Sequence, residues 1–128
     1  MSIVHKQIGS PDFLRWQDVP LRDYGREGFE GVTRQVPVGP QDDSYNFAIR
    51  YFRVEPGCTT NLERHAHEHG VVIVHGRARL QINDAFHELD TWDAAFISGN
   101  DLHQLTAISD TPMGFLCVIK PHETPRGT

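Results

Sequence analysis

The sequence predicts an all-β protein folded as a single sandwich or small barrel. Short segments are rich in β-branched and aromatic residues, and several of them alternate apolar with polar side chains, which is typical of strands. Gly, Asn, Asp and Pro separate these segments at short intervals, as they do in small antiparallel β proteins. A chain of 128 residues is long enough to bury one core, so we expect a single domain.

The expected strands follow from local patterns in chain order. Residues 46–54 alternate, and Pro56-Gly57 then predicts a turn. A continuous apolar run at 71–74, closed by Gly76, predicts a buried strand. Asn83-Asp84 predicts a hairpin between two alternating segments. The complete set of expected strands is 31–38, 46–54, 71–74, 77–82, 85–89, 94–97, 103–108 and 114–119.

The first 30 residues lack this pattern. Residues 12–16 can form a short helix or an arm that packs on the barrel. We therefore expect an N-terminal arm with the first strands over residues 1–40, the barrel over 41–120 and a C-terminal tail over 121–128. No internal repeat or second domain is evident.

Charge and cysteine content exclude several classes of partner. The formal net charge of −5, with histidines neutral, disfavours a nucleic-acid partner. Cys58 and Cys117 match no zinc-ribbon or redox spacing, and two cysteines are too few for a disulfide framework. The N-terminus lacks the apolar segment of a signal peptide, and no run approaches transmembrane length. We expect a cytoplasmic protein with no membrane partner.

The densest chemical signal is the run from residue 63 to residue 69. Glu63, His65, His67 and His69 share one register, so in an extended strand their side chains project from the same face. Imidazole and carboxylate ligands together suit manganese, iron, nickel, copper or zinc. One strand cannot complete a coordination sphere, and His103 is the best candidate for the distant ligand.

Residues 56–76, followed by Asp93 and His103, resemble the small single-domain members of the cupin family. The resemblance covers about residues 45–120 and implies a metal-binding jelly-roll barrel, also called a double-stranded β-helix. Counting back from Gly76 aligns the family's ligand set with Glu63, His65, His69 and His103. The carboxylate thereby moves to the first position, and His69 stands where the family has Glu. His67 then lies in the second shell, or it replaces Glu63 if the pair is His65 and His67.

The second cupin motif is less well matched. Residues 98–103 keep a turn before His103 but lack the proline that the family has there. Asp90-Thr91 stands where a glycine is usual.

Two further elements supply candidate functional residues. Cys117 lies in the last expected strand, where a buried small hydrophobe is the usual role. The resemblance implies instead that its thiol points into the barrel near the metal, as nucleophile or ligand. Arg50 and Tyr51 lie on a strand expected to face the motif, and an arginine inside the barrel would favour an anionic substrate group. The alternative for such an arginine is an outward, solvated position.

The resulting hypothesis is metal-assisted chemistry on a small polar molecule. One divalent ion, with manganese favoured over iron or nickel, would act as a Lewis acid and promote enolisation of a hydroxy-ketone or sugar phosphate. His67, Glu68 or a metal-bound hydroxide would accept the proton. The chain is similar to those small manganese cupins that move a methylthio group from a ketose phosphate to a thiol. A thiol co-substrate such as glutathione would then take part, and either Cys117 or that second thiol would be the nucleophile.

Two other functions and one assembly stay open at this point. The first is an oxygen-dependent cupin dioxygenase that uses iron, nickel or copper. The second is a ligand-binding or sensor cupin without catalysis. Small cupins often pair through an N-terminal strand, so the resemblance also implies a homodimer.

Overall fold

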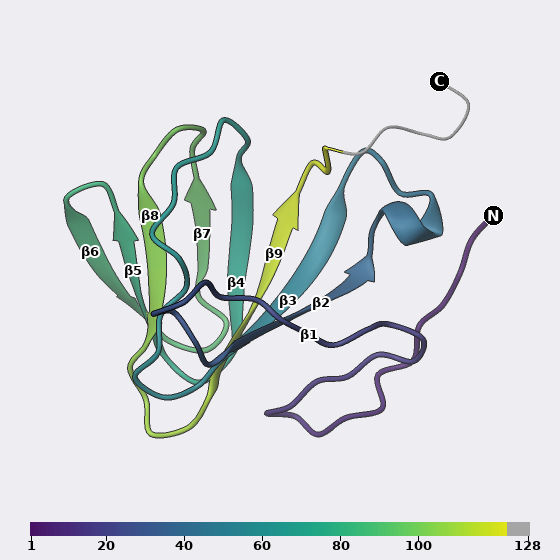
Figure 1. The fold of residues 1–128 in the computed structure, drawn as a ribbon, viewed down its shortest axis with the longest axis horizontal. Helices are drawn as coiled ribbons and strands as arrows, with labels where there is room; N and C mark the ends of the chain where they lie inside the picture. The colour runs from purple at the N-terminus through teal and green to yellow at the C-terminus, as the bar shows by residue number, and fades with distance from the viewer. Residues whose placement is uncertain (123–128) are drawn as a thin grey trace.

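The computed structural model describes residues 1–122, and the remainder of the expected tail, residues 123–128, lies outside the described residues. Two antiparallel sheets face each other across one core, as Figure 1 shows. The predicted all-β single-domain barrel is thereby confirmed. Over residues 1–122 no helix is long and apolar enough to cross a membrane.

The larger sheet has six strands in the order β1-β2-β3-β9-β4-β7, and the smaller has three in the order β6-β5-β8. The bounds are β1 Arg22–Asp23, β2 Val32–Val38, β3 Ala48–Val54, β4 His69–His75, β5 Ala78–Ile82, β6 Ala85–Leu89, β7 Ala94–Ile97, β8 His103–Ala107 and β9 Met113–Ile119, with a 3-10 turn η1 at Pro40–Asp42.

All eight expected strands are present, and most of them begin or end within two residues of the predicted position. Residues 12–16 form no helix. Isolated bridges between Ser10 and Phe13 and between Gln7 and Trp16 shape them into a hairpin-like arm instead. Their backbone groups thus bond to the preceding segment, which removes the partners that a helix would need.

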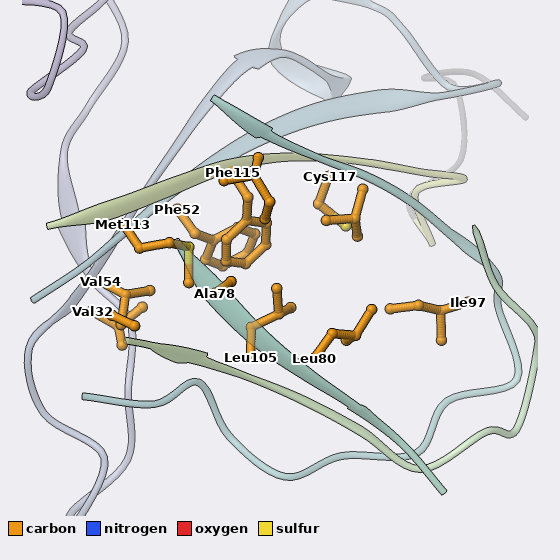
Figure 2. Close-up of a cluster of buried hydrophobic side chains, with 13 residues drawn as sticks. Val32, Phe52, Val54, Ala78, Leu80, Ile97, Leu105, Met113, Phe115 and Cys117 are labelled. Carbon is orange, nitrogen blue, oxygen red and sulfur yellow. The ribbon is translucent and has the colours of Figure 1, made fainter. Parts of the chain in front are cut away.

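The core lies between the two sheets, and Figure 2 shows its side chains. The rings of Phe52 and Phe115 stack with their centroids 4.9 Å apart. Leu80 and Leu105 from the smaller sheet are buried in the same cluster. Cys117 lies in this cluster too, at the end nearest Ile97 (Figure 2).

Part of the outer face of the larger sheet is buried as well, because the N-terminal arm covers it at β2 and β3. Trp16 packs edge-on against Tyr51, with ring centroids 5.4 Å apart. The side-chain amide of Gln35 donates to the carbonyl of Leu14 over 2.7 Å. The arm therefore anchors on buried polar groups as well as on aromatic contacts.

Tyr51 occupies a position other than the one expected from the sequence. It projects from β3 to this outer face, and its hydroxyl lies 2.5 Å from Nε2 of His75. His75 is buried, and its Nδ1 donates to the carbonyl of Pro112 over 2.9 Å. The register between β4 and β9 shifts between Ile73 and His75, immediately before the residue that makes these two contacts.

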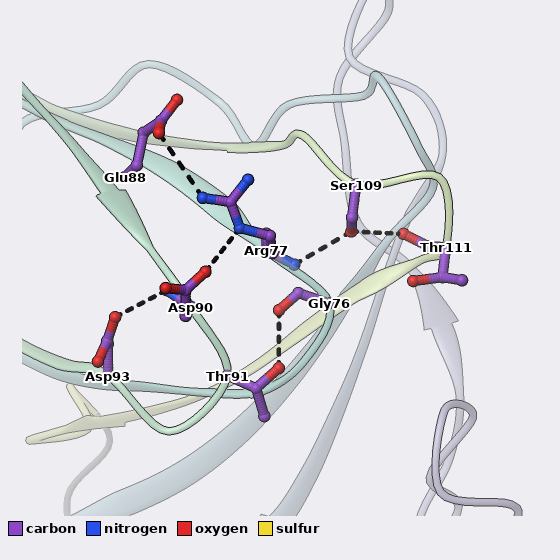
Figure 3. Close-up of polar contacts among 8 residues, drawn as sticks. All are labelled: Gly76, Arg77, Glu88, Asp90, Thr91, Asp93, Ser109 and Thr111. Carbon is purple, nitrogen blue, oxygen red and sulfur yellow. Dashed lines mark hydrogen bonds and ion pairs between the residues drawn. The ribbon is translucent and has the colours of Figure 1, made fainter.

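Turns at one end of the barrel are joined by polar contacts, shown in Figure 3. Nε of Arg77 lies 2.6 Å from a carboxylate oxygen of Asp90. The hydroxyl of Thr91 donates to the carbonyl of Gly76 over 2.8 Å, and the backbone N–H of Asp90 donates to Asp93 over 2.7 Å. These contacts fix the turn after β4 against the turn before β7.

Candidate metal centre

The histidine-rich segment crosses from one sheet to the other. Glu63 pairs with His103 of β8 through two backbone hydrogen bonds of 3.1 and 2.9 Å. His69 begins β4 in the larger sheet, and residues 64–68 connect the two without being a strand. The segment is therefore not one continuous strand, and its ends project into the space between the sheets from opposite sides.

Three imidazoles converge in that space. His65, His69 and His103 each offer a ring nitrogen, and these nitrogen atoms all lie within 4.8 Å of one another. The ring centroids of His69 and His103 are 4.7 Å apart, and that of His65 lies 5.4 Å from His103. Such an arrangement brings the ligand atoms within reach of one shared ion.

Hydrogen bonds orient two of these rings. Nδ1 of His103 donates to the carbonyl of Asp101 over 2.9 Å, because a carbonyl can only accept, and its Nε2 is left as the basic atom. Nδ1 of His69 lies 3.2 Å from the sulfur of Cys117. This use of one ring nitrogen as an anchor is typical of metal-ligating histidines.

Nε2 of His69 is buried and has no hydrogen-bond partner in the part of the chain that the structure describes. Burial and the nearby charges of His103 and Arg50 lower the pKa of His69 to about 3. The ring is thus neutral at physiological pH, and in the tautomer whose Nδ1 donates to the Cys117 sulfur its lone pair is on Nε2. A divalent cation would satisfy that orphaned atom, so the residues present fit a metal.

Glu63 adds a carboxylate to the cluster. Its Oε2 lies 2.5 Å from Nε2 of His65, and both residues line the same cavity. The set of Glu63 with the three imidazoles is the ligand set expected from the sequence. Its donor atoms, three nitrogens and one oxygen, suit a first-row divalent ion.

His67 lies beside this cluster but outside it. Its ring stacks on His65 at 4.7 Å between centroids and lies 4.8 Å from the ring of His69. It lines an outer hollow instead of the cavity that holds the other three imidazoles. Burial and the surrounding histidines lower the pKa of His67, so it is a neutral base at the edge of the centre.

Cys117 and Arg50 face each other across paired strands. They are partners in the register of β3 and β9, and the guanidinium of Arg50 donates to the Cys117 sulfur over 3.2 Å. Burial raises the pKa of the Cys117 thiol, and the Arg50 charge opposes that rise. Of the two positions that the sequence left open for Arg50, the structure has the inward one, beside the Cys117 sulfur.

These groups line one cavity that opens to solvent. Polar groups of Arg50, Glu63 and the three histidines line one part of it, and Phe52, Val71, Leu105 and Phe115 line another. A mainly apolar enclosure with a few convergent polar groups is typical of a small-molecule site. Tyr51 is absent from the residues that line it.

Sequence reasoning missed several lining residues. Thr60, Asn61 and Tyr24 all face the cavity, and Oδ1 of Asn61 is buried without a hydrogen-bond partner among the described residues. Tyr24 lies in the segment between β1 and β2, far along the sequence from the motif. No local pattern marks Thr60 and Asn61. They reach the site because the flanking residues Thr59 and Glu63 pair with β8.

The sequence model of the cupin-2 family, described as a cupin domain, matches residues 50–119. The chain belongs to this family. The match includes the whole histidine-rich segment, most of β3 and all of β4 to β9. A cupin with this cavity and these polar groups is best read as a small-molecule enzyme.

Individual relatives agree with this assignment. A protein of Rhodospirillum rubrum named 1-methylthio-D-xylulose 5-phosphate methylsulfurylase is 39% identical over 108 residues, which are 82% of this chain and 68% of that protein. A crystal structure of a cupin-2 domain from Rhodospirillum rubrum has a TM-score of 0.78 at 35% identity, covering 94% of this chain and 81% of that one. A cupin 2 conserved barrel protein from Rhodopseudomonas palustris has a TM-score of 0.79 at 29% identity, covering 97% and 85%.

Proposed function

We propose that this cupin is a metal-dependent transferase that moves a methylthio group from a methylthio-ketose phosphate to a thiol. The observation that carries the proposal is the cluster of three imidazoles within 4.8 Å, with the buried Nε2 of His69 left without a partner. His65, His69, His103 and Glu63 would hold one divalent ion, and we favour manganese. When bound, that ion would supply Lewis-acid polarisation of a carbonyl oxygen.

The residues around the cavity account for the remaining steps. The thiolate of Cys117 attacks the methylthio sulfur, so a sulfur–sulfur bond forms while the bond from that sulfur to the sugar carbon breaks. The proton that the Cys117 thiol gives up passes to His67 or Glu68, and the sugar carbon keeps the electron pair as an enolate. The same proton is then returned to that carbon, which gives the deoxy-ketose phosphate. A co-substrate thiol, such as glutathione, then displaces the methylthio group from Cys117 as a mixed disulfide.

Arg50 supports this chemistry through its contact with the thiol. A guanidinium 3.2 Å from the sulfur stabilises the thiolate relative to the thiol, against the effect of burial. This pairing favours a thiol-dependent transferase over an oxygen-dependent dioxygenase, which needs no cysteine.

The proposal is tested with untagged protein. We expect elemental analysis to find about one divalent ion per chain. Anaerobic incubation with 1-methylthio-D-xylulose 5-phosphate and glutathione should yield a deoxy-ketose phosphate and a methylthio–glutathione disulfide. Oxygen uptake with an enediol substrate would indicate the dioxygenase instead, and tight ligand retention without product would indicate a binding protein.

The role of the thiol has its own test. Cys117→Ser removes the nucleophile and should lower turnover by at least about 100-fold while metal content stays unchanged. Cys58→Ser is the matched control, because Cys58 is absent from the residues lining the cavity, and it should turn over normally. Normal turnover in Cys117→Ser would mean that Cys117 contributes only to core packing and is not the nucleophile.

We also propose a cytoplasmic homodimer. Large apolar side chains are exposed on the larger sheet, with Phe96 at 62% and Val118 at 42% of their full accessibility. Phe96 of β7 and Val118 of β9 are both paired in register with Gly70 of β4. The three residues therefore form one row across three neighbouring strands. Burying such a row against a second copy would stabilise a dimer. The reducing cytoplasm would keep the Cys117 thiol available.

A further inference from the structure

A second hollow opens beside the metal cavity, where the larger sheet extends beyond the smaller one. Figure 1 shows β1 and β2 lying past β3, on the side away from β5 and β6. The hollow and the cavity share Tyr24, Arg50 and His65, so the two are continuous. The far part of the hollow is lined by Arg22 and Arg34. We name this hollow, with Arg22, Arg34 and Arg50 along it, the arginine groove.

Strand register places these arginines on one face. Arg22 of β1 is directly opposite Arg34 of β2, and Arg34 is opposite Phe52 of β3. Residues directly opposite each other project to the same side of a sheet, and Phe52 is part of the core. Arg22 and Arg34 therefore point to the inner side of the sheet, the side of the metal cavity.

The arrangement is unfavourable without a ligand. Like charges directly opposite each other in an antiparallel pair destabilise the sheet. In the described part of the chain, no carboxylate forms an ion pair with Arg22, Arg34 or Arg50, although the protein has 17 acidic and only 12 basic residues. Within residues 1–122 other arginines also lack an acidic partner, Arg79 among them, but these three converge on a single hollow.

The ring of Tyr24 holds one of these guanidiniums in place. Arg34 lies over the Tyr24 ring, 5.0 Å from its centroid, and Tyr24 packs in turn on Phe52 with 5.0 Å between centroids. Stacking of this kind fixes the plane of a guanidinium and leaves its N–H groups to donate. Arg34 is only partly exposed, so its contacts are less screened than those of a free surface arginine.

We propose that Arg22 and Arg34 form the subsite that binds the phosphate group of the substrate, a phosphate monoester whose other end reaches the three histidines. The inference rests on the proposed function and adds which residues recognise the phosphorylated end. A phosphate dianion matches two adjacent guanidiniums in charge and in its number of acceptor oxygens. Its binding would also remove the repulsion between them.

The test compares two sugars that differ only in the phosphate. Isothermal titration of metal-loaded protein measures the affinities for D-xylulose 5-phosphate and D-xylulose at constant ionic strength. We expect the wild type to prefer the phosphorylated sugar by at least about tenfold, and Arg22→Gln and Arg34→Gln each to lower that preference by about tenfold. Contributions from the metal are the same for both sugars and cancel in the ratio.

Arg79→Gln is the matched control. It makes the same change of charge at an exposed position on β5, in the other sheet, and should keep the wild-type preference. Arg34→Lys keeps the charge without the planar fork and should lose part of the preference. Thermal unfolding identifies any variant that fails to fold. If either Arg22→Gln or Arg34→Gln fails to fold, the phosphate preference of the other variant is the test of the subsite.

The outcomes separate this inference from the proposed function. If methylthio transfer is absent but the phosphate preference falls in Arg22→Gln and Arg34→Gln, the subsite stands and serves another reaction of a phosphate monoester. If the preference persists in both variants, the subsite is wrong. If D-xylonate, a carboxylate, binds as tightly and with the same sensitivity to both changes, the site recognises anions in general and the proposal of a phosphate subsite fails.

Discussion

His69 is the residue on which the metal proposal depends most. Its Nδ1 is held by Cys117, and its buried Nε2 has no partner among the described residues. We predict that His69→Ala lowers metal affinity by at least about 100-fold, since loss of an outer hydrogen-bond partner alone costs about 10- to 100-fold. Elemental analysis after dialysis against a metal buffer measures this. His87→Ala changes an exposed histidine of β6 and should keep full metal content.

Single substitutions can also decide whether Glu63 or His67 is the fourth metal ligand. Glu63 lines the cavity with the three imidazoles, whereas His67 stacks on the outer side of His65. We therefore predict that Glu63→Ala loses more bound metal than His67→Ala. In parallel assays, His67→Ala should slow turnover and keep the metal. The reverse order of metal loss would move the carboxylate out of the ligand set.

The ligand candidates came from the spacing of a family motif and not from strand alternation, because residues 64–68 are not a strand. The sequence was not sufficient for Tyr51, which was expected at the substrate site together with Arg50. Adjacent residues of a strand point to opposite faces, so only one of the two can line the cavity. Because the N-terminal arm buries the outer face of β3, both faces read as apolar, and the sequence does not show which one is inner.

Gly114 shows how the elements constrain each other. A Cβ added there would lie 2.0 Å from Nε2 of His75, whose ring crosses over β9 to reach the Tyr51 hydroxyl on β3. The ring cannot move freely, because its Nδ1 donates to Pro112. No local pattern marks this contact, since it joins β3 and β4 to β9, which lies far from both in the sequence.

We predict that Gly114→Ala destabilises the protein by about 2 kcal/mol or more, through overpacking and loss of a buried hydrogen bond. Urea denaturation followed by circular dichroism measures the change in the free energy of unfolding. Gly70→Ala is the control, because a Cβ at that strand position meets only the Cβ of Val118, at 4.0 Å. Its free energy of unfolding should differ from the wild type by less than about 0.5 kcal/mol. Equal effects of the two substitutions would contradict the role assigned to His75.

At the scale of the whole molecule, the site exists only because two sheets meet. His103 comes from the smaller sheet, His69 from the larger, and His65 from the connection between them. The sequence predicted the strands but contained no signal for the arginine groove. Arg22 and Arg34 come together through the pairing of β1 with β2, and β1 is only two residues long.

The burial of several histidines gives the metal-free protein a defined pH dependence. Burial lowers the pKa of His67, His69 and His75 in the folded state below the ordinary value of 6.5. As the pH falls through about 6.5, the unfolded chain therefore takes up protons that the folded protein does not, and the free energy of unfolding decreases. For His69 the decrease continues toward its folded pKa of about 3.

His5 acts in the opposite direction. Its hydrogen bond to Asp42 raises its pKa in the folded state, so its stabilisation is fully present below the unfolded pKa and is lost as the pH rises through the folded value. We predict that, with a chelator present, three histidines outweigh one and the protein is less stable at about pH 5 than at about pH 7.5. His5→Gln removes the opposing contribution, so urea denaturation should show a larger loss of stability between these two pH values. Equal stability of the wild type at both pH values would contradict the lowered pKa values of the three rings in the folded protein.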